Sequence, residues 1–501
     1  MTAGQNRSAL FAKVALAVLA VCATELFVYN SGFGYDAFEY LVIGRSLNEG
    51  YRFFAFVPSK SWGIYALVAA YLRVPYGSTH LGVSLLVTAI LLLVCAATFQ
   101  VVRRRGYTPR AALLSAVLVG AAALFMELNY LEPTGLVYLA GLMSFAAVTG
   151  PGADRRAWPW LAAGAWVGVG TAFKSVAVLY LVGLILWSAR RMWADDHRRR
   201  VEGLEHIALM MTGCVAVIAA QAVYFWLSGR FQPYVEWTFT FPLLYYPAHV
   251  QWLSKLYTKL LWVWLVVAAA IAASFDRRIR LAIQADDKIQ LLLVMGAVSL
   301  VSLLKTQSSH YAFPGAAFLL IGAAVVADQW LARCWKGSFV AIVTFGAVAL
   351  TSMLVSVALY RPAALLRLVT VRQFDDEERL ATELRALVPP GAAAIFLEGG
   401  TKSYWFSGHY PVWPVLNTDV QTTYFVQHRA AKLLATLDAP GLQLVEFNPR
   451  TSEYDDERFF AAPESQLFLQ TVQRRLESGF TRHDTRAGVF WTRAASLSSG
   501  R

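Results

Sequence analysis

The chain has 501 residues, of which 57% are hydrophobic and only 15% are charged. Soluble domains carry about 25% charged residues, so this composition excludes an ordinary soluble protein and indicates an integral membrane protein. The net charge of +12 does not indicate nucleic-acid binding, because the excess of Lys and Arg lies within residues 1–370, in short loops between apolar segments. The four cysteines have no zinc-ligand spacing and no disulfide framework.

The first apolar segment runs from Val14 to Tyr29 and follows Arg7 and Lys13. A cleaved signal peptide is the alternative interpretation, with a cleavage site near Ala23. We favour an uncleaved span with a cytoplasmic N-terminus, because cleavage would leave the later basic loops on the wrong side of the membrane.

Two carboxylates, Asp36 and Glu39, follow this first span directly. They are three residues apart, so on a helix they share one face. They also lie where the span is expected to emerge into water. Ala37–Leu47 and Trp62–Leu72 are predicted to be short helices that lie on the membrane interface, because both are too short to cross it.

The next 300 residues consist largely of apolar segments that are predicted to cross the membrane. The predicted spans are His80–Val102, Ala111–Met126, Thr134–Val148, Trp160–Phe173, Val176–Trp187, Gly203–Leu227, Leu260–Phe275, Ile289–Leu304, Tyr311–Val326 and Phe339–Tyr360. With the first span the chain has about eleven. A loop of about thirty residues, rich in aromatic side chains, is predicted between Leu227 and Leu260. The Arg clusters that follow alternate spans all face the cytoplasm only if residues 62–72 do not cross. The charges therefore predict an N-in, C-out polytopic α-helical membrane protein.

Residues 371–501 differ in character, because they hold half of the acidic residues of the chain. Helices are predicted at Glu377–Val388, Tyr424–Leu437 and Ser465–Glu477, and strands at Ala392–Leu397, Leu442–Phe447 and Val489–Thr492. The chain is thus predicted to have a transmembrane catalytic domain, residues 1–370, and a soluble α/β domain, residues 371–501, on the outer face.

The predicted topology places a mixed set of polar residues on the outer side. They are Asp36, Glu39, Arg45, Arg52, Lys60, Glu127, Glu132, Lys174, Glu236, Lys255, Lys305 and His310. Lys and Arg can offset the charge of a phosphate, and a carboxylate can take a proton from an attacking hydroxyl. An outer cavity that collects these groups would suit a lipid phosphate that carries a sugar.

Five sequence patterns connect these residues with a known family. They are Asp36-Ala37-Phe38-Glu39-Tyr40 after the first span, Ile43-Gly44-Arg45-Ser46-Leu47-Asn48-Glu49-Gly50-Tyr51, Pro58-Ser59-Lys60-Ser61-Trp62-Gly63, Gly168-Val169-Gly170-Thr171-Ala172-Phe173-Lys174, and Lys305 followed by His310-Tyr311-Ala312-Phe313-Pro314. On these residues, and on their order and topology, residues 10–330 resemble the GT-C class of membrane glycosyltransferases. The most similar branch contains the bacterial protein O-mannosyltransferases and aminoarabinose transferases. Lys60 matches a Lys of that branch, but the double proline that should follow it is absent, which leaves the role of Lys60 open.

The resemblance implies an inverting glycosyltransferase in the bacterial inner membrane, with its active site and C-terminal domain facing the periplasm. A sugar would pass from a polyprenyl phosphate to a glycan, lipid or protein acceptor. Asp36 would be the general base and Glu39 a second catalytic carboxylate. The substrate-binding candidates are Arg52, Lys60, Glu127, Lys174, Lys305 and His310. No cofactor is predicted, and a divalent cation beside Asp36 and Glu39 is an open alternative.

Simpler interpretations of the same residues also stand. Asp36 could cap a helix, Glu39 could be a solvated helix residue, and Lys174 could extend to the interface from a span end. Glu127 could belong to the outer surface, and His310 could be an interfacial histidine with its hydrogen bonds satisfied. A lipid or sugar-lipid transporter would need the same charges only to bind cargo. No repeated halves of the kind common in transporters are evident, and the polar residues are expected at the surface rather than at mid-membrane. The sequence does not identify the sugar, the acceptor or the oligomeric state.

Overall fold

The computed structural model describes residues 35–58, 60–126, 128–193, 197–245, 267–268, 271, 275–304, 309–334, 375–397, 400–416, 420–447, 463–485 and 488–493. The predicted first and last spans lie outside these residues, as does nearly all of Leu260–Phe275. The chain divides into two compact units. Unit 1 comprises residues 1–33, 76–231 and 248–371, and unit 2 comprises residues 34–75, 232–247 and 372–501.

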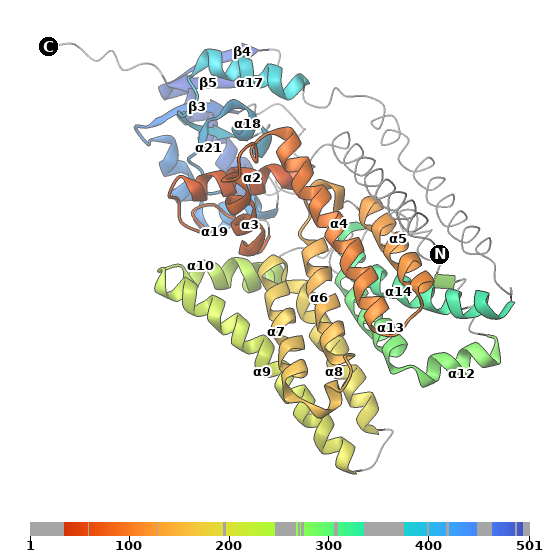
Figure 1. The fold of residues 1–501 in the computed structure, drawn as a ribbon. Helices are drawn as coiled ribbons and strands as arrows, with labels where there is room; N and C mark the ends of the chain where they lie inside the picture. Colours follow the sequence, from red (N-terminus) through yellow and green to blue (C-terminus); the bar gives the residue numbers. More distant parts are fainter. Residues whose placement is uncertain are drawn as a thin grey trace. The chain divides into compact units, whose positions relative to one another are not determined.

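Unit 1 is a bundle of helices (Figure 1). Its longer helices are α4 (His80–Arg104), α5 (Pro109–Phe125), α6 (Thr134–Val148), α7 (Ala157–Phe173), α8 (Val178–Trp193), α9 (His197–Leu227), α12 (Arg277–Ala285), α13 (Asp287–Ser299) and α14 (Ser309–Cys334). The side chains of Thr79, Thr108 and Asp286 accept hydrogen bonds from the first backbone N–H groups of α4, α5 and α13, so these helices begin at ordinary N-caps.

Four helices of the described part of the chain are long and apolar enough to cross a membrane: His80–Arg104, Ser175–Met192, Arg200–Leu227 and His310–Trp330. Together with the shorter apolar helices α5 and α6, they confirm a multi-pass helical membrane protein. The number of spans and their orientation remain predictions. The bounds of α6 coincide with the predicted span Thr134–Val148.

The basic loops meet at one end of unit 1. Arg191 pairs with Asp154 at 3.2 Å and with Asp287 at 3.5 Å. Lys288 donates from Nζ to the backbone oxygen of Arg105 at 2.8 Å. These contacts join the ends of α4 and α8, the start of α13 and the segment between α6 and α7. The arginine clusters that the sequence places on one side of the membrane are therefore neighbours in space.

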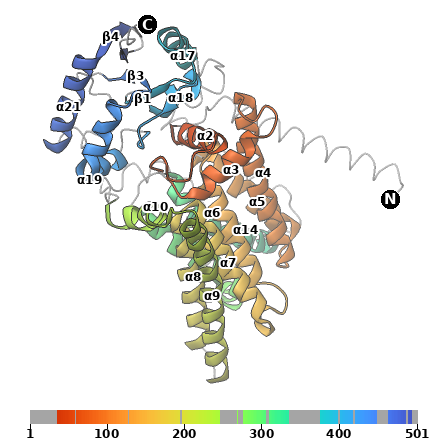
Figure 2. The ribbon, with the colours of Figure 1, turned by 90° about the vertical axis from the view of Figure 1, so that its left-hand side faces the viewer.

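Unit 2 contains a five-stranded sheet with the order β2-β1-β3-β5-β4. Its strands are β1 (Ala393–Phe396), β2 (Tyr410–Pro411), β3 (Leu442–Glu446), β4 (Phe480–Thr485) and β5 (Gly488–Arg493). Strands β2, β1 and β3 are parallel, whereas β5 runs antiparallel to β3 and to β4. Helices α17 (Asp375–Leu387) and α18 (Gly400–Ser407) lie on one side of the sheet, and α19 (Val420–Leu437) and α21 (Pro463–Gly479) on the other (Figure 2).

Unit 2 also includes segments from the N-terminal half of the chain. Helices α2 (Tyr35–Asn48) and α3 (Trp62–Leu72) pack against each other, and α2 packs on α18. Val57, Trp237 and Phe241 belong to the same buried cluster as core residues of the sheet such as Ile395 and Trp413. The hydrophobic core of unit 2 is therefore assembled from three separate stretches of sequence.

The prediction of a long aromatic-rich loop after Leu227 is wrong for the part of this segment that the structure describes. Residues there form α10 (Phe231–Val235) and the π-helix η4 (Glu236–Tyr245). Glu236 of η4 accepts hydrogen bonds from Arg429 at 2.8 Å and from Tyr424 at 3.1 Å. Apolar side chains of η4, including Trp237, are buried in unit 2, and this burial stabilises the helical segment.

Candidate functional site

Asp36 forms an ion pair with Lys60. The distance from Lys60 Nζ to Asp36 Oδ2 is 2.8 Å. Asp36 lies in the first turn of α2, where a carboxylate is favoured by the helix dipole, and Lys60 lies in the segment that enters α3. The Asp36 side chain is 34% exposed, whereas that of Lys60 is 10% exposed. The carboxylate is thus held in one orientation by a nearly buried ammonium group and is still open to an incoming molecule.

Glu39, the second predicted catalytic carboxylate, is buried one turn further along α2. It is 2% exposed and accepts a hydrogen bond of 2.5 Å from the hydroxyl of Tyr65 on α3. The same hydroxyl accepts a hydrogen bond of 3.1 Å from the backbone N–H of Lys60. Glu39 therefore reaches the Asp36–Lys60 ion pair through Tyr65. This geometry differs from that of a solvated helix residue.

Close packing of α2 against α3 holds Glu39 and Tyr65 within hydrogen-bond distance. A Cβ atom at Gly44 would lie 2.8 Å from Val68 Cγ1 and 3.1 Å from the backbone nitrogen of Ala69. The helices can approach this closely only because Gly44 has no side chain. Asn48 adds a hydrogen bond of 2.8 Å to the backbone oxygen of Ala69.

Arg45 connects α2 to the sheet domain. Its guanidinium group donates to the backbone oxygens of Tyr404 at 3.2 Å and His409 at 3.1 Å. Burial lowers the pKa of Arg45, and the Glu49 carboxylate opposes that shift. The buried His409 ring contacts the backbone oxygen of Val388 at 3.1 Å through Nε2, and desolvation lowers the pKa of this histidine. The two hydrogen bonds of Arg45 hold α2 against the sheet domain and so help to fix the position of Asp36 on that helix.

A second polar cluster lies in unit 1, at the end of α7. Lys174 Nζ is 3.7 Å from Glu132 Oε2, and His310 Nε2 is 3.8 Å from the same oxygen. All three residues are buried. Lys174 follows the last residue of α7, Glu132 precedes α6 and His310 lies at the start of α14, so three helix ends meet here. The cluster therefore occupies the end of unit 1 opposite to the basic loops.

Tyr311 completes this second cluster. The Lys174 ammonium group lies 3.5 Å from the centroid of the Tyr311 ring, a cation–π contact that orients the lysine. The lysine also has the Glu132 carboxylate as a counter-charge. At 3.7 Å and 3.8 Å the two contacts to Glu132 are longer than ordinary hydrogen bonds. The Glu132 carboxylate thus balances the charge of Lys174 without forming a short hydrogen bond to Lys174 Nζ or to His310 Nε2.

The structure brings together Asp36, Glu39 and Lys60 in unit 2, and Lys174 and His310 in unit 1. Arg52 is exposed in the segment that follows α2. Glu127 and Lys305 lie outside the described residues. Within the described part of the chain, no group of three or more His, Cys, Asp or Glu side chains converges in a way that could hold a metal ion.

Sequence reasoning missed Tyr65, and it named Tyr311 within the pattern after Lys305 without giving it a role. Tyr65 lies in the apolar helix α3, where a buried phenol must find a hydrogen-bond partner, and Glu39 is a polar residue that the neighbouring helix could supply.

No protein-family model and no curated protein sequence matches the chain. Among solved structures, ArnT from Cupriavidus metallidurans bound to undecaprenyl phosphate matches with a TM-score of 0.61 and 15% identity, over 98% of this chain and 99% of that protein. This chain has the GT-C fold. The fold that the sequence-based resemblance implies is therefore confirmed.

A second solved protein has a similar fold. The oligosaccharyltransferase of Archaeoglobus fulgidus matches in its apo form with a TM-score of 0.51 and 10% identity, over 96% of this chain and 74% of that protein. Its complex with Zn and sulfate matches with a TM-score of 0.50 and 12% identity, over 92% of this chain and 69% of that one. At these identities the likeness describes the fold.

Proposed function

We propose that this protein is an inverting glycosyltransferase that moves a sugar from a polyprenyl phosphate to an acceptor on the outer face of the membrane, with Asp36 as the general base. The observation that carries the proposal is the partly exposed Asp36 carboxylate, paired at 2.8 Å with the Lys60 ammonium group. It stands in a chain whose fold matches, over nearly its full length, a GT-C protein solved with undecaprenyl phosphate.

Asp36 has the properties that a general base requires. Its carboxylate is oriented by Lys60, and a third of its side chain is open to solvent, so an acceptor hydroxyl could reach hydrogen-bond distance. The acceptor oxygen would attack the anomeric carbon as its proton passes to Asp36. The bond between that carbon and the phosphate oxygen would break on the opposite side, which inverts the anomeric configuration. The transition state has oxocarbenium character, and a nearby anion stabilises it.

The leaving group of this reaction is a lipid phosphate. It is a weak base, so it needs neutralisation of its charge more than a proton. Lys60 is the candidate cation beside Asp36. A phosphate oxygen that drew Lys60 away from Asp36 would make that carboxylate a stronger base when the donor is bound. Arg52 is the second candidate on this part of the chain.

The buried cluster of Lys174, Glu132 and His310 is the candidate anion site of unit 1. In the free protein Glu132 balances the charge of Lys174, because a buried ammonium group without a counter-charge is costly. A phosphate oxygen could take the place of Glu132 at 3.7 Å. The substrate-binding role that the sequence predicts for Lys305 and Glu127 remains part of the proposal.

The orientation in the membrane is also proposed. The basic loops meet at one end of unit 1, and Lys174 and His310 lie at the other. If the basic end faces the cytoplasm, the candidate anion site faces the periplasm, away from cytoplasmic nucleotide sugars. A lipid-linked donor then follows from the topology. Residues 371–501 would form an extracytoplasmic domain.

The test is sugar transfer by the purified full chain in reconstituted vesicles. Polyprenyl phosphates that carry a labelled sugar are supplied with a cell-envelope fraction as acceptor, and the anomeric configuration of the product is read by NMR. The proposal predicts labelled product with inverted configuration. Retained configuration would refute the mechanism. Movement of the label across the bilayer without transfer would instead establish a transporter.

A further inference from the structure

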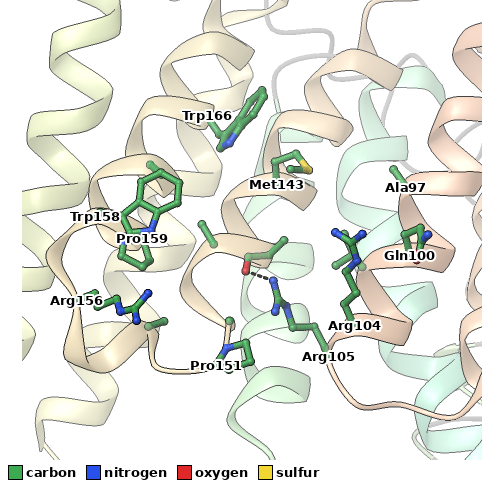
Figure 3. A pocket seen from close by; sticks show the side chains of 16 residues that line it. Ala97, Gln100, Arg104, Arg105, Met143, Pro151, Arg156, Trp158, Pro159 and Trp166 are labelled. Atoms are coloured by element: carbon green, nitrogen blue, oxygen red, sulfur yellow. Dashed lines mark hydrogen bonds between the residues drawn. The ribbon is translucent and has the colours of Figure 1, made fainter.

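Unit 1 contains a groove that the proposed reaction does not use. It has a volume of about 460 Å³ and is formed by α4, α6 and α7 together with the loops at the basic end of the bundle (Figure 3). It is separate from the cluster of Lys174, Glu132 and His310, none of which lines it.

The walls of the groove are apolar. Met143 and Trp166 line it, and both are more than one-third exposed. Trp158, at the start of α7, is 66% exposed and also lines it. In a multi-pass membrane protein such side chains face lipid tails, and an exposed tryptophan near a helix end is typical of the interface between lipid and water.

The end of the groove is cationic. Arg104, Arg105 and Arg156 all line it, and no carboxylate does. Figure 3 shows Arg104 and Arg105 on the α4 side and Arg156 on the α7 side, beyond the aromatic wall. The nearby carboxylate of Asp154 is engaged by Arg191 at 3.2 Å. Among the described residues, no side-chain ion pair is formed by Arg104, Arg105 or Arg156.

Arg105 is the most enclosed of the three arginines. It donates a hydrogen bond to the backbone oxygen of Ala146 (Figure 3), whereas its buried Nε has no hydrogen-bond partner among the described residues. Burial lowers the pKa of Arg105, and the neighbouring positive charge of Arg104 lowers it further. An anion at this end would relieve both effects.

We propose that this groove binds an anionic phospholipid of the leaflet that covers the basic end of unit 1. The phosphate would lie between Arg104 and Arg156 and beside Arg105, and one acyl chain would run along Met143 and Trp166. Charge complementarity selects this occupant: the groove offers three guanidinium groups to the headgroup and an apolar wall to the chain. Basic pockets between helices at the cytoplasmic side of membrane proteins bind such headgroups.

The test is lipid retention by the full chain, purified in detergent and measured by native mass spectrometry. Phosphatidylglycerol is compared with phosphatidylcholine of the same acyl chains. The double variant R104Q/R156Q removes two charges and leaves Arg105, which donates a hydrogen bond to the backbone oxygen of Ala146 near the end of α6. Its matched control is R103Q/R155Q, which removes two charges from the adjacent residues, neither of which lines the groove. Because each basic residue near a membrane surface contributes about fivefold, R104Q/R156Q should lose about 30-fold in affinity for phosphatidylglycerol.

The expected result is preferential retention of phosphatidylglycerol by the wild type and by R103Q/R155Q, with loss in R104Q/R156Q. Equal losses in both double variants would overturn the proposal, because they would reflect general surface charge. Equal retention of phosphatidylcholine by the wild type would also overturn it.

A second variant tests the groove without changing charge. Ala97 lines the groove on α4, and Ala97→Leu would narrow it. It should weaken phosphatidylglycerol retention while all three arginines remain. Competition with inorganic phosphate separates the two parts of the site: phosphate should displace the lipid only weakly if the apolar wall contributes. Unchanged retention in Ala97→Leu, or complete displacement by phosphate at low concentration, would contradict a lipid in this groove.

Discussion

The hydrogen bond between Tyr65 and Glu39 makes a prediction that follows from geometry alone. Both side chains are 2% exposed, and the oxygen–oxygen distance is 2.5 Å. Tyr65→Phe deletes the hydroxyl and leaves the ring in place. A hydrogen bond to a charged group is worth about 1.5–3 kcal/mol, and the backbone N–H of Lys60 loses its acceptor as well. The free energy of unfolding should fall by about 2–3 kcal/mol.

A double-mutant cycle with Glu39→Gln isolates the pair. Unfolding is followed by tryptophan fluorescence in a denaturant titration of the detergent-solubilised protein. Residues in direct contact show coupling energies of about 0.5–3 kcal/mol, and we expect about 1–2 kcal/mol here. Tyr76→Phe is the control, because the Tyr76 side chain is 82% exposed and its loss should be nearly neutral. Additive effects of the two changes, within about 0.5 kcal/mol, would refute the assigned contact.

Three further predictions concern binding, pH and packing. Lys174→Met should weaken binding of a polyprenyl phosphate about tenfold or more, measured by titration in nanodiscs, whereas Lys288→Met, at the opposite end of unit 1, should leave it unchanged; equal effects would contradict the anion site. Because burial lowers the pKa of His409 from its ordinary value of 6.5, the stability that the neutral ring contributes is full above that pH and is lost as pH falls. Between pH 7.5 and pH 5 the free energy of unfolding should therefore fall more for the wild type than for His409→Gln. Equal falls in the two proteins would show that protonation of His409 is not the cause. Gly44→Ala should reduce the free energy of unfolding by about 1–3 kcal/mol in the same titration, because its Cβ would lie 2.8 Å from Val68 Cγ1. Gly441→Ala is the control, because a Cβ there meets no atom within 4 Å. An equal reduction for both variants would disprove the close packing of α2 and α3.

The sequence predicted helices well where a long apolar run ends in a clear stop. The predicted interfacial helix Trp62–Leu72 has the same bounds as α3. Helix α18 and strand β4 were missed. In β4 the sequence FTRHDT is mostly polar, and the strand is defined by pairing with β5 and not by its own pattern. A strand of this kind is stabilised by pairing with its neighbour, so its own sequence does not show the hydrophobic alternation that would predict it.

The candidate site was predictable in its residue types and less so in its contacts. Asp36 was marked by its place after the first span, and its carboxylate indeed has a basic neighbour, Lys60. The pairing itself depends on how α2 packs on α3, which the spacing of charges does not encode. The π-helix η4 lies in the segment that was predicted to be an aromatic-rich loop, and it contains Pro242, a residue that disfavours a helix interior. Its order comes from burial in a core built by residues almost 200 positions further along the chain.

The central claim is that Asp36 is the base for sugar transfer, and Asp36→Asn tests it most directly. The measurement is the initial rate of transfer from a labelled polyprenyl-phosphate sugar in reconstituted vesicles. The control is Asp484→Asn, the same chemical change at an aspartate that pairs with Arg482 at 2.7 Å in the β4 strand of unit 2. Loss of a general base is expected to reduce the rate by about 10²–10⁴-fold, with donor binding retained. The account predicts this loss for Asp36→Asn and a normal rate for Asp484→Asn. A normal rate for Asp36→Asn in correctly inserted protein would contradict it.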